Sequence, residues 1–226
     1  MHGYQLDLHE LPLFRDVSPK EVEQFITSTG ASVKRYAKGT RILKAYEPNT
    51  NIGVMVEAQA QVIAEDRFGN ESIGHTLERG AMMGSASAIL PQFQPNNNTS
   101  IETLTDVIVL WVSYRSLLVA GPKLGRTHGL VMRNLLEAFC RKNVMMMEKI
   151  QLLSQKTLRE RLITYLLQRE GRYQNEQVKV PGRVQLAKEI ECNRSALTRE
   201  ITAMKAEGML TVGDDWLRLN KAAIGC

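Results

Sequence analysis

Two arginines and two hydroxyl side chains lie close together near the C-terminal end of the chain, at Arg194, Ser195, Thr198 and Arg199. A guanidinium can donate two hydrogen bonds to O6 and N7 of a guanine, which is worth about 1–3 kcal/mol of discrimination between bases. Serine and threonine bind phosphates or base edges with little base preference. These residue types indicate DNA recognition, and the candidate contacts are Arg183, Asn193, Arg194, Ser195, Thr198 and Arg199.

A pair of short helices around a tight turn must present these side chains, and the run Gly182–Ile201 has that pattern. The predicted inward face consists of Leu186, Ala187 and Ile190 on the first helix and Leu197, Ile201 and Met204 on the second. After Gly208, two short apolar segments flank the turn Gly213–Asp215 and predict a β-hairpin. A helix-turn-helix followed by a hairpin is a winged helix.

Two other functions stay open at this point. A winged helix can also bind a protein, so the chain could be a small-molecule-sensing protein whose winged helix serves protein interaction. A cupin-like enzyme is disfavoured, because His2, His9 and His128 form no HxH pair. The chain also has no nucleophile–base motif, phosphate-binding loop or dinucleotide fingerprint, and we predict that the protein is not an enzyme.

A long helix is predicted from about Lys123 to Leu153, and its apolar positions repeat at spacings of four and three residues. That heptad seam favours a partner helix, and it consists of Met132, Leu136, Phe139, Asn143, Met146, Ile150 and Leu153. Asn143 takes an a position, where a buried amide can fix register and two-strandedness. The alternative is an amphipathic helix packed only on its own domain. The pattern breaks at Ser154–Lys156, and Thr157–Glu160 is a capping box that begins another helix, so we predict a hinge between them.

The N-terminal half predicts one helix and then a β-rich domain. Ser18–Glu21 is a capping box with proline at the first helical position, and the helix should end near Gly30. From Ala31 to Trp111 short β-rich segments alternate with turns such as the one at 68–70, which suggests a small antiparallel barrel or sandwich. Pro91–Ser100, with asparagines at 96–98, is predicted to be a surface loop.

Composition excludes several classes of protein. The chain has 226 residues and a formal net charge of +5, and from Lys156 onward it has 13 basic and 9 acidic side chains, which favours a polyanionic partner. Its three cysteines, Cys140, Cys192 and Cys226, form no CxxC pair, so a disulfide framework, a zinc site or a four-cysteine cluster is disfavoured. No run reaches 18 apolar residues and no leader pattern is present, so we expect a cytoplasmic protein with no membrane partner.

Nearly the whole chain resembles the Crp–Fnr (cAMP receptor protein and fumarate–nitrate regulator) family, most strongly from Glu148 through Asn220, where Arg194 and Arg199 match the family's DNA-reading arginines. The resemblance implies an α+β fold: an N-terminal β-roll (cyclic-nucleotide-binding-like, a double-stranded β-helix), a long dimerisation helix and a C-terminal winged helix-turn-helix. The corresponding domains are 1–121, 122–154 and 155–226. It also implies a homodimeric transcription regulator that binds a pseudo-palindromic operator in double-stranded DNA, with RNA polymerase and an unidentified small-molecule effector as candidate partners.

Departures from the family pattern change the expected base specificity of the recognition helix and the expected identity of the effector. Ser195 stands where the recognition helix often has glutamate, and Glu191 where the turn often has glycine. In the β-roll, Ser85 replaces the glutamate that binds the cAMP ribose, and Thr99 replaces the arginine that pairs with its phosphate. Cyclic AMP is therefore disfavoured.

The other sensing modes of the family are disfavoured too. An iron–sulfur cluster is disfavoured because the chain has no cysteines near its N-terminus. Haem is disfavoured because His75 is the only histidine in the predicted strands that could be its axial ligand. No metal site or cofactor is predicted, and the chain could also respond to no effector at all. The candidate effector contacts are Gly84, Ser85, Ser87, Thr99, Ser100, Met146 and Met147.

Overall fold

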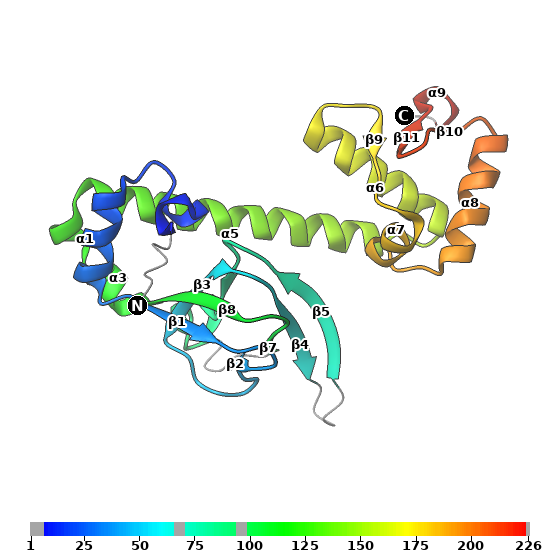
Figure 1. Cartoon of the computed structure of the whole chain (residues 1–226). Coiled ribbons are helices and arrows are strands. Elements are labelled where there is room, and N and C mark those ends of the chain that lie inside the picture. The colour runs from blue at the N-terminus through cyan, green and yellow to red at the C-terminus, as the bar shows by residue number, and fades with distance from the viewer. Residues whose placement is uncertain (1–6, 66–70, 94–98, 225–226) are drawn as a thin grey trace. The chain divides into compact units, whose positions relative to one another are not determined.

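The computed structural model describes residues 7–65, 71–93 and 99–224, and Figure 1 shows their helices and strands. The chain forms two compact units, residues 1–138 (unit 1) and 139–226 (unit 2). The boundary falls inside one long helix, α5, which spans Arg126–Leu153. The predicted turn at 68–70 and the asparagines at 96–98 lie outside the described residues. The division into three domains stays a prediction.

Unit 1 begins with two short 3-10 helices, η1 (Leu8–Glu10) and η2 (Pro12–Phe14), followed by α1 (Pro19–Thr29). The predicted capping box is confirmed, because the Glu21 carboxylate accepts hydrogen bonds from the backbone amide and the hydroxyl of Ser18. These two hydrogen bonds lower the pKa of Glu21 to about 2. Gly30 ends the helix with φ of 64°, a left-handed conformation that suits glycine.

Eight strands then form two four-stranded antiparallel sheets. The strands are β1 (Ser32–Tyr36), β2 (Arg41–Leu43), β3 (Asn51–Glu57), β4 (Ala60–Glu65), β5 (Glu71–Leu77), β6 (Met82–Met83), β7 (Thr99–Thr103) and β8 (Val107–Ser113). One sheet has the order β1-β8-β3-β6 and the other β2-β7-β4-β5, so β1 and β2 are edge strands. Apolar side chains from both sheets, including Met55, Ile101 and Val109, form one buried cluster. The predicted antiparallel sandwich is confirmed.

Three short helices accompany the sandwich: α2 (Ser85–Ile89) lies between β6 and β7, and α3 (Tyr114–Val119) and α4 (Gly121–Leu124) connect β8 to α5. The prediction that one helix starts near Lys123 is wrong, because Gly125 has φ of 50° and separates α4 from α5. A residue with positive φ cannot continue a right-handed helix.

Unit 2 consists of the second half of α5, four further helices and a small sheet. The elements are α6 (Leu158–Tyr173), β9 (Val178–Lys179), α7 (Arg183–Glu189), α8 (Arg194–Ala206), β10 (Leu210–Val212), β11 (Trp216–Leu219) and α9 (Lys221–Ile224). The predicted capping box at Thr157 and Glu160 is confirmed. The hairpin β10–β11 is also confirmed, and β9 extends it to a three-stranded sheet. One buried cluster joins α5, α6, α7, α8 and this sheet.

Candidate nucleic-acid interface

The helices α7 and α8 pack through the side chains that the sequence predicts to face inward. Leu186, Ala187, Ile190, Leu197, Ile201 and Met204 are all buried in the core cluster of unit 2. The backbone amide of Cys192 donates to the carbonyl of Ala187 at 2.9 Å, which closes the turn between the helices. Burial of this face leaves the opposite face of α8 toward solvent.

The exposed face of α8 carries the predicted contacts. Arg194, Ser195, Thr198 and Arg199 are all exposed, within the first two turns of the helix. Asn193 is the N-cap, and its side-chain oxygen accepts from the amide of Ser195 at 2.8 Å. The Thr198 hydroxyl donates to the carbonyl of Arg194 at 3.0 Å. Asn193 therefore has a structural role in starting α8, in addition to its predicted place at the interface.

Two groups of arginines in unit 2 differ in their contacts. Arg159, Arg161, Arg169 and Arg172 all make hydrogen bonds or ion pairs inside the unit. Within the described part of the chain, Arg194 and Arg199 make neither an ion pair nor a side-chain hydrogen bond. The two guanidiniums of the exposed α8 face are thus available to an external partner.

Arg183 differs from both groups. It is the first residue of α7 and is half-buried, and its Nη1 atom is buried without a hydrogen-bond partner among the described residues. A buried donor that makes no hydrogen bond costs about 1–3 kcal/mol, and more when the group is charged. The half-buried Arg183 side chain must therefore change its conformation before this nitrogen can reach an acceptor outside the chain.

An ion-pair clamp holds the second half of α8 against α6. The Arg159 guanidinium donates to Glu200 at 2.6 Å, and to both carboxylate oxygens of Glu207 at 2.6 and 2.9 Å. These hydrogen bonds raise the pKa of Arg159, and the one from Arg159 lowers the pKa of Glu207. Sequence reasoning missed this clamp, since its partners are more than 40 residues apart.

A second set of contacts fixes the turn between α7 and α8. Glu191 has φ of 52°, a left-handed conformation that is energetically unfavourable for a residue with a Cβ atom. This strain accounts for the glycine that the Crp–Fnr pattern often has at this position. Lys149 on α5 donates to the carbonyl of Glu189 at 2.6 Å and pairs with the Glu191 carboxylate at 3.1 Å. Arg161 on α6 donates to the carbonyl of Glu191 at 3.3 Å. The strained turn is therefore held by two neighbouring helices.

Glu189 also joins α6 to α7. Its carboxylate accepts from the Tyr165 hydroxyl at 2.8 Å and from Arg169 at 2.7 Å, while the Arg169 guanidinium lies 4.5 Å from the Tyr165 ring centroid. Burial and the hydrogen bond to Glu189 raise the pKa of Tyr165. The predicted hinge at Ser154–Lys156 is consequently bridged, because α5 residues before it contact α7 and α6 directly.

The hairpin β10–β11 adds one candidate contact that sequence reasoning missed. Arg218 is exposed between the buried Leu217 and Leu219, and it has no ion pair with the described residues. The alternation of apolar and polar residues was the signal that could have found it. The turn requires Gly213, because a Cβ atom there would lie 2.2 Å from the Trp216 indole.

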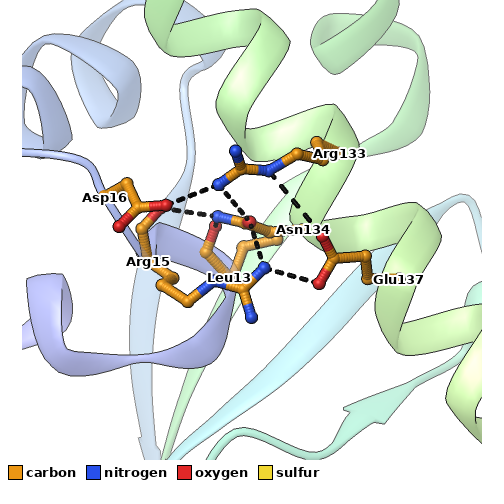
Figure 2. Close-up of polar contacts among 6 residues, drawn as sticks. All are labelled: Leu13, Arg15, Asp16, Arg133, Asn134 and Glu137. Atoms are coloured by element: carbon orange, nitrogen blue, oxygen red, sulfur yellow. Dashed lines mark hydrogen bonds and ion pairs between the residues drawn. The ribbon is translucent and has the colours of Figure 1, made fainter.

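Most residues of the predicted seam are accessible on α5 within their own unit. In unit 1, Asn134 is 4% exposed and donates to the carbonyls of Leu13 and Arg15 at 3.0 and 2.8 Å (Figure 2). In unit 2, Leu152 is buried in the core cluster. The seam residues Leu136, Asn143, Met146 and Ile150 are exposed, and Met132, Phe139 and Leu153 are half-buried. Leu153 packs against the core of unit 2.

The predicted effector residues in unit 1 are mostly engaged by other protein groups. Asn49 donates from Nδ2 to the carbonyl of Gly84 at 2.8 Å and to the Ser87 hydroxyl at 3.4 Å. Ser100 is buried and its hydroxyl accepts from the amide of Ala45 at 3.0 Å. Ser85 and Thr99 are half-buried. Met146 and Met147 are exposed on α5 in unit 2.

The described residues contain neither a candidate metal site nor a candidate membrane span. Among residues 7–65, 71–93 and 99–224, no group of three or more histidine, cysteine or acidic side chains could hold a metal ion. In the same ranges, no helix combines the length and apolar character that a membrane span requires.

Comparison with solved structures identifies the fold. The catabolite activator protein of Thermus thermophilus is 20% identical, with a TM-score of 0.54, and the match covers 94% of this chain and 95% of that one. A substituted form of CprK complexed with OCPA is 13% identical, with a TM-score of 0.61, and coverage is 87% and 89%. A cyclic nucleotide-binding domain from Methylobacillus flagellatus is 14% identical, with a TM-score of 0.53, and coverage is 62% and 76%.

No protein-family model and no curated protein matches the sequence. The structural matches combine helices and sheets in the same way as this chain, and two of them cover most of its length. The chain therefore has the mixed helix-and-sheet, cyclic-nucleotide-binding-like fold of catabolite-activator-like proteins, as the resemblance to the Crp–Fnr family implied.

Proposed function

We propose that this chain is a homodimeric transcription regulator of the Crp–Fnr type that binds a pseudo-palindromic operator through α8. The observation that carries the proposal is the exposed face of α8, where Arg194 and Arg199 have no internal partner among the described residues while four other arginines of unit 2 do. Helices α7 and α8 serve as the helix-turn-helix, and the hairpin β10–β11 serves as the wing. The Arg183 guanidinium, at the first residue of α7, donates a hydrogen bond to a phosphate once its side chain turns outward.

The positions of the covered residues on α5 support the proposed dimer. Asn134 lies two residues from both Met132 and Leu136, so at about 100° per residue it is on the opposite side of the helix. The same holds for Glu148, which lies two residues from Met146 and Ile150, and which binds Gln168 and Arg172 on α6. Within each unit, the contacts of Asn134 or Glu148 thus lie opposite the nearest seam residues, which supports pairing of two chains along those exposed apolar residues.

Pairing along this seam delivers two copies of α8 to one face of DNA, about 34 Å apart, which is one helical turn. The operator is expected to contain guanines that the two arginines contact in each half-site. Ser195 discriminates cytosine poorly compared with a glutamate, so we expect a half-site that differs from that of cAMP receptor proteins. The pocket of Ser85 and Thr99 lacks the groups that bind cAMP.

The DNA proposal is tested by selecting binding sites from random duplexes with the wild-type chain and with Arg199→Ala. We expect the variant to bind the selected operator about 10–100-fold more weakly and to lose preference at one position per half-site. Arg115→Ala is the matched control, because this substitution removes the same charge from an exposed residue on α3 in unit 1. Unchanged sequence preference in Arg199→Ala contradicts the role assigned to α8.

The dimer proposal is tested with two adjacent methionines of nearly equal exposure. Met146, 56% exposed, lies on the seam, whereas Met145, 59% exposed, lies off it. We expect Met146→Asp and Phe139→Asp to sediment as monomers, because a carboxylate buried in the seam is strongly unfavourable. Met145→Asp should remain a dimer. A dimer that survives Met146→Asp, or that is lost in both methionine variants, contradicts the seam.

A further inference from the structure

Unit 1 contains a solvent-facing cavity of about 400 Å³ beside the edge strands β1 and β2. Residues of β1, β2, β3 and β8, together with the end of α1 and the start of α3, line it. On β1, Ser32, Lys34 and Tyr36 share one face by strand alternation, and Tyr36 packs against the cluster between the sheets. Lys34 therefore lies on the cavity-lining face of an edge strand, where the residue is exposed to solvent. The cavity's volume suits a small molecule.

The groups that line this cavity form an electropositive, hydrogen-bonding surface. Among the described lining residues Lys34 is the single charged side chain, and most of the others carry hydroxyl or amide groups. Ser32, Lys34 and Asn51 make no side-chain hydrogen bond or ion pair with the described residues. The Trp111 indole donates to the Tyr36 hydroxyl at 2.9 Å, which leaves the phenol proton free to donate.

We propose that this cavity binds a small hydroxylated monocarboxylate of the sugar-acid type. The Lys34 ammonium pairs with the carboxylate, because a charge-assisted hydrogen bond is about twice as strong as a neutral one. Ser32, Tyr36 and Asn51 bind the hydroxyl groups of the ligand. The site is distinct from the Gly84 to Ser100 region, whose Ser87 and Ser100 hydroxyls already bind protein groups.

Asn49 connects the cavity to that region. It lines the cavity, and its side-chain nitrogen donates to the carbonyls of Asn51 and Gly84 at 2.7 and 2.8 Å. Gly84 precedes α2, so a ligand that moves Asn49 also moves the start of that helix. An effector role for the ligand rests on the proposed function, whereas binding of the ligand in the cavity does not.

A competing explanation assigns Lys34 a purely structural role. A charged side chain on an edge strand deters pairing with another chain. That role predicts no saturable binding of any carboxylate, and no dependence of such binding on Lys34. The two explanations therefore differ in what a titration shows.

The test is a titration of the full chain with D-gluconate, with sorbitol as the neutral analogue. Isothermal calorimetry follows the wild-type chain, and Trp111 fluorescence follows a Trp216→Phe chain. We expect saturation near ~1 mM or below and at least tenfold weaker binding of sorbitol. Lys34→Met should weaken gluconate binding at least tenfold, since it removes the ammonium and keeps the stem. Lys38→Met, an exposed lysine outside the cavity, should stay within twofold of wild type.

Absence of saturation with gluconate overturns the proposal, as does equal gluconate binding by Lys34→Met. These titrations contain no DNA, so they are independent of the proposed function. A second series measures DNA affinity with and without gluconate, and a change of about 5–150-fold is expected for an effector. If gluconate binds but DNA affinity is unchanged, the effector role is refuted and the proposed binding site stands.

Discussion

Replacing Asn134 by leucine should destabilise unit 1 far more than breaking the ion pairs that surround it. Figure 2 shows the cluster, in which Asn134 and Arg133 on α5 meet Leu13, Arg15 and Asp16 of the N-terminal segment. The buried amide donates two hydrogen bonds to main-chain carbonyls, each worth about 1 kcal/mol net and more if the carbonyl then stays buried and unpaired. Asn134→Leu keeps the volume, so we expect a loss of about 2–4 kcal/mol.

Arg133→Met is the control variant. Arg133 pairs with Asp16 at 2.6 Å and with Glu137 at 3.8 Å, but its side chain is 45% exposed. Exposed ion pairs contribute about 0.2–1 kcal/mol, since water solvates the separated charges well. Arg133→Met should therefore cost less than about 1 kcal/mol.

Urea unfolding measures both variants. Trp111 is the one tryptophan of unit 1, so its fluorescence in a Trp216→Phe background follows that unit. With a urea dependence of about 1–3 kcal/mol per M, Asn134→Leu should lower the midpoint by about 1 M or more. A midpoint shift in Arg133→Met equal to or larger than that in Asn134→Leu refutes the ranking of the buried amide above the exposed charges.

Two further predictions concern the strained turn and the N-terminal capping box. Glu191→Gly should be about 0.5–1 kcal/mol more stable than Glu191→Ala in urea unfolding of unit 2. Both variants remove the carboxylate, but only glycine adopts the positive φ without strain. Equal stabilities of the two variants would rule out strain at this residue. The folded-state pKa of Glu21 is about 2, below its ordinary 4.5, so its stabilising effect is present above pH 4.5 and disappears as pH falls through 2. The melting temperature of wild type should thus fall more between about pH 6 and about pH 3 than that of Glu21→Gln, and parallel falls would show that Glu21 does not contribute.

Several features could be predicted from the sequence because they depend on neighbours within one or two turns. The two capping boxes need only a residue and its partner three positions later, and both form as predicted. The inward faces of α7 and α8 follow from helical spacing, and the hairpin from alternating segments around Gly213. The exposed side of α8 follows in turn, since burial of Leu197, Ile201 and Met204 leaves Arg194 and Arg199 outward.

Other features depend on contacts between residues far apart in the chain, for which no local pattern exists. The start of α5 was mispredicted because the conformation of Gly125 carries no periodic signal. The hold of Lys149 on the α7–α8 turn and the Arg159 clamp join residues about 40 positions apart or more. Pairing of the strands likewise decides that Lys34 and Trp111 line the same cavity. Sequence periodicity thus determined which side chains face in or out, and tertiary packing decided which distant polar groups meet, because such a meeting depends on how the whole backbone folds.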